Sequence, residues 1–193
     1  MLKMSFDNSR TKIQAFLFSV FLASLALLLN NFGSLAITNP ENKNNITEIF
    51  NKSIALLNQS KFEEAITWYD KVLEIDPNNV NALNNKGFAL YNLGRYEEAI
   101  TWYDKVLEID PKNVGALFNK AVTLASLGKQ EEAITWYDKV LEIDPKNVNT
   151  FVNKALTLAS LDKQEEALIW INKALTLDPT NQKISQLKSQ LEK

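Results

Sequence analysis

The sequence contains no cysteine and no histidine, and it has only five glycines and five prolines. Without cysteine there can be no disulfide, no thiolate nucleophile and no cysteine-bound metal. Without histidine the chain lacks the commonest general base and the commonest ligand of transition metals. No glycine-rich phosphate loop and no nucleophile–base pair takes their place. We therefore expect a protein that is not an enzyme and that has no cofactor and no metal site.

The chain also lacks an excess of positive charge. Its 21 lysines and arginines stand against 23 aspartates and glutamates, which gives a net charge of −2. Much of the basic bias lies within residues 1–12, so the remainder of the chain is more acidic still. Because affinity for nucleic acid comes mainly from neutralising phosphates, we expect no nucleic-acid partner.

A long apolar run occurs near the N-terminus. Residues 1–12 are polar with three cations, and residues 15–29 then read AFLFSVFLASLALLL. This order is typical of a secretory signal peptide, and Ser34-Leu35-Ala36 offers a cleavage site. Residues 1–36 are therefore interpreted as a signal peptide or, alternatively, as a membrane anchor.

The anchor remains an alternative because residues 13–29 come close to the length of about 20 apolar residues that spans a bilayer. An internal hydrophobic helix is a third interpretation. In the first two cases the preceding cations stay on the cytoplasmic side, so the rest of the chain lies outside the cytoplasm. Membrane contact is expected only through residues 13–29, if they are not cleaved. Residues 37–45, ITNPENKNN, are predicted to be a flexible linker.

The remainder of the sequence repeats itself. The string EEAITWYDKVLEIDP occurs three times, starting at Glu63, Glu97 and Glu131, and a degraded copy, EEALIWINKALTLDP, starts at Glu165. The spacing is 34 residues each time. A fixed period of this length indicates a repeated supersecondary unit.

Each unit reads as two helices. Over residues 62–75 the apolar residues recur at intervals of three and four, which predicts an amphipathic helix. Pro77 ends this helix, because the residue before a proline avoids the helical conformation. A second stripe at Leu83, Gly87 and Leu90 predicts another helix, which Gly94 ends in a left-handed cap. Neither helix can bury its apolar face alone, whereas stacked neighbours can.

This pattern closely resembles the tetratricopeptide repeat (TPR). With the proline of each Asp-Pro pair as position 32, position 8 is small, position 20 is alanine and position 24 is aromatic except for Ile171. The resemblance implies an all-α fold, a right-handed α-solenoid of helix-turn-helix repeats whose function is protein–protein interaction. A capping helix is expected over 182–193, where Ile184, Leu187 and Leu191 have helical spacing. The four repeats are 46–79, 80–113, 114–147 and 148–181.

Three further features recur in every repeat. Glutamate pairs such as Glu63-Glu64 are interpreted as helix-start charges, since adjacent helical residues diverge too far to share a metal or a proton. The tryptophans at position 23 are expected to be mostly buried, with an exposed aromatic binding ladder as the alternative. Position 7 carries lysine, whose stem is expected to lie on apolar surface while its head reaches water. These tryptophans are Trp68, Trp102, Trp136 and Trp170, and the lysines are Lys52, Lys86, Lys120 and Lys154.

The resemblance places the ligand surface in the concave groove formed by the first helix of each repeat, at positions 2, 5, 9, 12 and 13. These positions are apolar and rich in asparagine here, so we expect them to bind a peptide or helix of a partner protein. The clamp that other TPR domains use for chaperone C-termini is not expected, because positions 5 and 9 carry no cation. Self-association by stacking of repeats is the alternative function. Further inward residues are Leu57, Asn58, Ser126, Asn149, Leu156 and Ser160. The candidate groove residues are Phe50, Ile54, Asn81, Asn84, Phe88, Tyr91, Asn92, Phe118, Val122 and Val152.

Overall fold

The computed structural model describes residues 40–192, with side chains from residue 45 onward. Within this range the chain is helical and contains no strand. It divides into two units after Glu48, inside helix α2 (Pro40–Asn58), and the second unit contains the repeats. The predicted signal peptide or anchor lies outside the described residues. From Pro40 onward, no helix is both long enough and apolar enough to cross a membrane.

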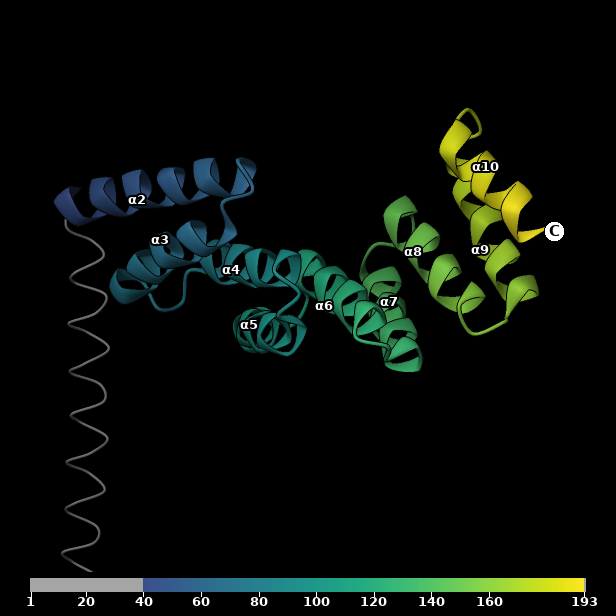
Figure 1. Cartoon of the computed structure of the whole chain (residues 1–193), viewed down its shortest axis with the longest axis horizontal. Coiled ribbons are helices and arrows are strands. Elements are labelled where there is room, and N and C mark those ends of the chain that lie inside the picture. Colours follow the sequence, from purple (N-terminus) through teal and green to yellow (C-terminus); the bar gives the residue numbers. More distant parts are fainter. Residues whose placement is uncertain (1–39, 193) are drawn as a thin grey trace, which may run out of the picture. The chain divides into compact units, whose positions relative to one another are not determined.

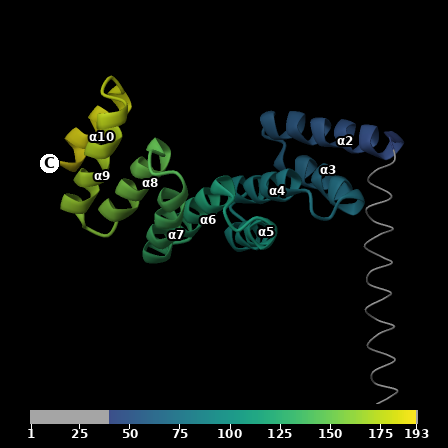
Figure 2. The same ribbon diagram turned by 180° about the vertical axis from the view of Figure 1, so that it is seen from behind.

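The helices of the repeat unit follow one another in pairs (Figures 1 and 2). From α3 to α10 each helix packs on the next, and α4 also contacts α6, as α6 contacts α8. This arrangement confirms the all-α solenoid, and α3 has the predicted bounds. After α2 the helices are α3 (Phe62–Ile75), α4 (Val80–Asn92), α5 (Tyr96–Ile109), α6 (Val114–Ser126), α7 (Gln130–Ile143), α8 (Val148–Ala159), α9 (Gln164–Leu177) and α10 (Gln182–Leu191).

The predicted flexible linker over residues 37–45 is contradicted from Pro40 onward. Helix α2 already begins at Pro40, so residues 40–45 are helical, while residues 37–39 lie outside the described range. Proline is well suited to the first position of a helix, because its φ is already fixed near the helical value and the N–H that it lacks would have no partner there. The asparagine-rich composition suggested a linker, but a favourable helix start at Pro40 makes these residues helical.

The turn between repeats is built by the sequence Asp-Pro-x-Asn. In the first turn, the Asn79 side-chain amide donates to the Asp76 carboxylate at 3.1 Å, and the Asn79 side-chain oxygen accepts from the backbone N–H of Ala82 at 3.0 Å. The asparagine is thus the N-cap of the next helix and satisfies one of its free N–H groups. The same pairing recurs at Asn113, Asn147 and Asn181.

The turn inside each repeat has a residue of positive φ at position 15. Gly94 and Gly128 take φ values of +74° and +83°, as expected for glycine. In the first and last repeats the same place is held by Ser60 and Asp162, both at φ +58°. The outer repeats therefore form the same turn with residues that adopt it less readily.

The core lies where the second helix of one repeat meets the first helices of its own and the next repeat. The position-20 alanines have no exposed surface, and neither does Tyr69. Tyr103 lies so close to α4 that a Cβ added at Gly87 would be 2.6 Å from its ring. At the C-terminal end, α10 covers the last repeat through buried Ile184, with Leu187 and Leu191 packed beside it.

Candidate protein-binding site

The predicted groove residues lie on the first helices of the repeats, and none of them is fully buried. The side chain of Phe88 is 39% exposed, and Leu156, at the same position two repeats later, is 45% exposed. Exposed apolar side chains at matching positions are what a peptide-binding surface requires. Phe50 and Ile54 lie on α2, Asn81, Asn84, Phe88, Tyr91 and Asn92 on α4, Phe118 and Val122 on α6, and Val152 on α8.

A hollow of about 280 Å³ lies on this face, between residues of α4, α6 and α8. It brings together the predicted residues Tyr91 and Val122, and the Tyr91 and Ser126 hydroxyls lie 3.3 Å apart there. Leu156 lines its far side. The hollow also includes Asn153 and Thr157, at positions 6 and 10, which the inward positions inferred from the resemblance leave out.

The asparagines of this face form contacts between neighbouring repeats. The Asn119 side-chain amide donates to the side-chain oxygen of Asn84 at 3.2 Å, which ties α6 to α4. Asn92 and Asn153 instead donate to backbone carbonyls one turn back, at 2.8 and 2.9 Å. Several of the asparagine amides that were predicted to bind a ligand therefore form hydrogen bonds within the protein. The exposed side chain of Asn81 on α4 makes no hydrogen bond within the described residues.

Aromatic rings of the groove rest on the buried tyrosines beneath it. The ring centroids of Phe50 and Tyr69 are 6.1 Å apart, and those of Phe118 and Tyr137 are also 6.1 Å apart. Phe118 and Val122 pack against the core cluster of the third repeat. These two residues therefore contribute to both core and groove, whereas Phe88 projects outward.

The tryptophans at position 23 are half-buried, and each carries two lysine ammonium groups over its ring. Over Trp102, the Nζ atoms of Lys86 and Lys105 both lie 3.8 Å from the ring centroid. Such cation–π contacts stabilise by about 0.5–1 kcal/mol each at exposed sites. The rings are thus occupied by the protein's own lysines and do not form a free aromatic ladder. The same pairs are Lys52 and Lys71 on Trp68, Lys120 and Lys139 on Trp136, and Lys154 and Lys173 on Trp170.

Three of the four position-7 lysines, Lys86, Lys120 and Lys154, differ from the sequence expectation, because each ammonium group is held in an ion pair. Lys52 of the first repeat is exposed. Lys86 is only 8% exposed and Lys154 only 6%. The ammonium group of Lys86 forms an ion pair with Asp70 of the preceding repeat, in addition to its contact with Trp102. A buried ammonium group needs such partners. These lysines therefore link consecutive repeats, and the remaining pairs are Lys120 with Asp104 and Lys154 with Asp138.

Burial also raises the pKa of the position-24 tyrosines. For Tyr137 it raises the pKa to about 12, although a hydrogen bond with the Thr157 hydroxyl acts the other way. Tyr103 is paired in the same manner with Thr123. Opposite Tyr69, the position of these threonines is occupied by Ala89. The Tyr69 hydroxyl makes no hydrogen bond of satisfactory geometry within the described residues. Ser53 and Asn85 nevertheless lie close enough to lower its pKa, against the effect of burial.

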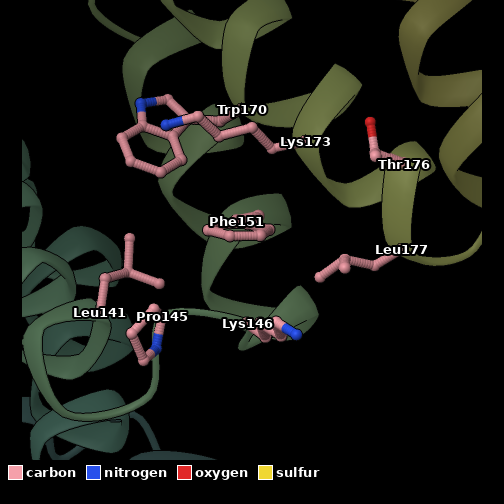
Figure 3. A pocket seen from close by; sticks show the side chains of 8 residues that line it. All are labelled: Leu141, Pro145, Lys146, Phe151, Trp170, Lys173, Thr176 and Leu177. Atoms are coloured by element: carbon pink, nitrogen blue, oxygen red, sulfur yellow. The ribbon is translucent and has the colours of Figure 1, made fainter.

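A second and larger pocket, of about 450 Å³, lies at the junction of the third and fourth repeats (Figure 3). It shares no residue with the groove hollow. Sequence reasoning did not find it, although Phe151 is an aromatic residue at a position that is aliphatic in the other repeats. Its lining residues are Leu141, Pro145, Lys146, Phe151, Trp170, Lys173, Thr176 and Leu177.

The fold has close counterparts among solved structures. A structure described as MamA 41-end from Desulfovibrio magneticus RS-1 aligns with a TM-score of 0.69 at 25% identity, over 76% of this chain and 82% of that one. Another crystal structure of MamA aligns with a TM-score of 0.66 at 18% identity, over 93% and 99% of the two chains. The first TPR of Spaghetti (RPAP3), bound to the HSP90 peptide SRMEEVD, aligns with a TM-score of 0.56 at 24% identity, over 58% and 90%. No curated protein matches the chain by sequence.

Sequence models of the repeat match most of the array. A TPR repeat model matches residues 55–94, and tetratricopeptide repeat models match 80–113, 114–147 and 136–169. The matches at 80–113 and 114–147 coincide with the second and third 34-residue units. With the paired helices, the Asp-Pro-x-Asn turns and the stacked core, these matches show that the chain belongs to the tetratricopeptide repeat family.

Proposed function

We propose that this protein is a non-catalytic interaction module that binds a peptide or helix of a partner protein along the first helices of its repeats. The observation that supports this proposal is the hollow across α4, α6 and α8, flanked by exposed apolar side chains on the same face. Phe88 and Leu156 supply contact area, while Tyr91 and Ser126 offer hydroxyls for backbone groups of a ligand. The repeat domain of Spaghetti (RPAP3), which has the same fold, binds a peptide.

The chemistry of this groove favours an apolar ligand segment over a terminal carboxylate. Positions 5 and 9 of the repeats hold Phe50, Asn84, Phe88 and Phe118 among others, and none of them is a cation. A carboxylate would find no charge partner there, whereas a row of apolar side chains spaced along a helix would find exposed apolar partners. We therefore propose an amphipathic helix or extended apolar segment as the ligand.

An affinity isolation with three forms of the full chain tests this proposal. The unmodified protein is compared with the groove variant Phe88→Asp/Leu156→Asp and with the matched control Ile109→Asp/Ile143→Asp. The control places the same two charges on similarly exposed residues of α5 and α7. A partner retained by the control and lost by the groove variant supports the groove. Equal capture by all three forms, once circular dichroism shows equal helicity, contradicts it.

We further propose that the repeats lie outside the cytoplasm, either exported or tethered to the membrane. The support is the order of the N-terminal sequence, in which a cationic start precedes the apolar run at 15–29. Fractionation of the source cells tests the location, and the mass of the mature chain tests cleavage near residue 36. Recovery of the intact chain from the cytoplasmic fraction alone would contradict this proposal.

Self-association by stacking of repeats is the alternative function, and it has less support. Inner junctions use an aspartate at position 25 to hold the lysine of the next repeat, whereas the last repeat has Asn172 at that position. Helix α10 already covers the end of the array. Sedimentation equilibrium of the full chain tests this alternative, which requires a mass that increases with protein concentration.

A further inference from the structure

We propose that the pocket between the third and fourth repeats is a second binding site, independent of the groove, for an acidic peptide segment that carries one large apolar side chain. The pocket has an apolar interior formed by Leu141, Pro145, Phe151 and Leu177. Figure 3 shows the Phe151 ring in the middle of this lining, with the Lys173 side chain extending along Trp170. Its volume of about 450 Å³ is enough for a leucine or phenylalanine side chain together with part of its backbone.

The charged residues that line the pocket are of one sign. Lys146 and Lys173 belong to its lining, and no aspartate or glutamate does. The described residues form no ion pair with either lysine, whereas Lys154, on the same tryptophan, is paired with Asp138. On a chain that is acidic overall, an apolar pocket bordered by two such cations is complementary to an anionic segment with an apolar side chain.

Three residues that line the pocket differ from those at the same positions of the other repeats, and two of these changes alter its chemistry. The third, Leu177, replaces an isoleucine. Position 4 is aliphatic in the first three repeats and is Phe151 in the fourth, where its ring lies 5.4 Å from that of Trp170. Position 29 is glutamate in the first three repeats, at Glu74, Glu108 and Glu142, and is Thr176 in the fourth. The first change widens the aromatic surface, and the second removes a carboxylate from beside the lysines.

The packing of the helices agrees with this difference. Helices α7 and α8 pack less extensively than α3 on α4 or α5 on α6, which leaves the space that the pocket occupies. Around the junction of the second and third repeats, Leu83 and Val106 are buried in one cluster with Ala116. The pocket at the next junction is lined by residues that depart from the repeat, Phe151 and Thr176 among them.

A fluorescence-anisotropy titration with two labelled peptides tests the proposal on the full chain. The probe is a ten-residue peptide with a central phenylalanine between aspartates and glutamates, and the comparison peptide has serine in place of phenylalanine. We expect the first peptide to bind and the second to bind at least about tenfold more weakly, because one buried aromatic ring contributes more than the 1.4 kcal/mol that a tenfold change represents. Binding should also weaken as salt is raised from 0.05 to about 0.5 M.

The decisive variant is Thr176→Glu, which restores the residue that the other repeats carry and is therefore compatible with folding. It should weaken binding of the phenylalanine peptide about tenfold, and Lys146→Gln should weaken it about threefold. The matched control is Asn172→Asp, which adds the same charge to the same helix, also restores a repeat residue and does not line the pocket. The groove variant Phe88→Asp should bind this peptide normally.

The possible outcomes separate the two proposed sites. Loss of binding in Thr176→Glu with normal binding in Asn172→Asp and Phe88→Asp supports the pocket. Equal weakening by Thr176→Glu and Asn172→Asp would show a diffuse charge effect and overturn the proposal. Loss of binding in Phe88→Asp alone would place the peptide in the groove, and absence of binding to the unmodified chain would also overturn the proposal while leaving the groove untouched.

Discussion

The inner repeats of the array and its last repeat have nearly the same sequence, yet they differ at several positions of the second helix, three of which change its contacts. At the inner junctions a lysine joins an aspartate of the preceding repeat to a tryptophan of its own, as Lys120 does with Asp104 and Trp136. In the last repeat the position of the aspartate is occupied by Asn172, and the corresponding lysine of the capping helix, Lys188, pairs with Glu192 at 3.7 Å.

The second difference is the buried residue at position 24, which is tyrosine in the first three repeats and Ile171 in the fourth. The third is the replacement of glutamate by Thr176 at position 29. All of these changes lie on α9, and together they remove two acidic groups and one buried hydroxyl. The comparison shows that identical strings repeat the same contacts, while the last repeat departs from them and has a pocket beside it.

The largest expected effect comes from placing a charge in the core at two positions along the array. Ala133→Glu buries a carboxylate without a partner in the third repeat and should lower the free energy of unfolding by about 4 kcal/mol. Ala167→Glu buries a carboxylate in the last repeat, whose neighbours are one other repeat and the capping helix α10. It should lower the free energy of unfolding by less than Ala133→Glu does. Thermal unfolding followed by circular dichroism measures both, and equal losses would contradict the distinction between inner and terminal repeats.

A smaller effect is expected at the buried tyrosine hydroxyls. Thr123→Ala removes the partner of Tyr103 and should cost about 1–2 kcal/mol, because a buried hydroxyl is left unpaired. Ala89→Thr provides Tyr69 with the residue that Tyr103 and Tyr137 already have, and should stabilise by about 1 kcal/mol. Urea unfolding measures the two changes. Destabilisation by Ala89→Thr would show that the space beside Tyr69 differs from that in the later repeats.

A loss of stability of similar or smaller size is expected when the ion pair between lysine and aspartate is removed. Asp104→Asn makes an inner junction resemble the last repeat, and should lower stability by about 0.5–1 kcal/mol because the aspartate is half-exposed. Asn172→Asp makes the reverse change and should raise stability by at most about 0.5 kcal/mol, through Lys188. Urea midpoints at low and high salt distinguish an electrostatic contribution, which high salt should reduce in both variants.

The smallest effect appears only at alkaline pH. Burial raises the pKa of Tyr137 to about 12, whereas an unfolded tyrosine ionises near pH 10. The neutral hydroxyl is therefore favoured in the folded state, and its contribution to stability is complete below pH 10 and is lost as the pH rises towards 12. The decline in urea midpoint between pH 9 and 11 should be less steep in Tyr137→Phe than in the unmodified chain. An unchanged slope would show that other groups control alkaline unfolding.

Much of the fold follows from local patterns in the sequence. The intervals of three and four apolar residues predicted α3 with its observed bounds, and Gly94 has the predicted left-handed conformation. These features depend on interactions within a few residues of one another, so the sequence reveals them directly. The linker prediction for 37–45 was wrong from Pro40 onward. The asparagine-rich composition suggested a flexible segment, but proline favours the first turn of a helix.

The candidate site was predictable in part. The register of the repeats placed Tyr91 and Val122 on the first-helix face, and the structure brings both into one hollow. That this face binds a ligand remains a prediction. The lysines at position 7 were expected to reach water, because nothing in their own repeat shows the aspartate of the preceding repeat that holds them.

The sequence by itself determined the repeat, its two helices, the turns between them and the apolar residues of the core, because each depends on local conformational preference and on periodic burial. Tertiary structure alone decided which groups meet across repeats that are 34 residues apart. It joined Lys86 to Asp70, left the Tyr69 hydroxyl without a hydrogen bond of satisfactory geometry among the described residues, and set Phe151, Trp170 and Thr176 around one pocket. These contacts depend on how one helix pair is stacked on the next. The stacking is common to the array, but the groups that it brings together differ wherever a side chain is substituted.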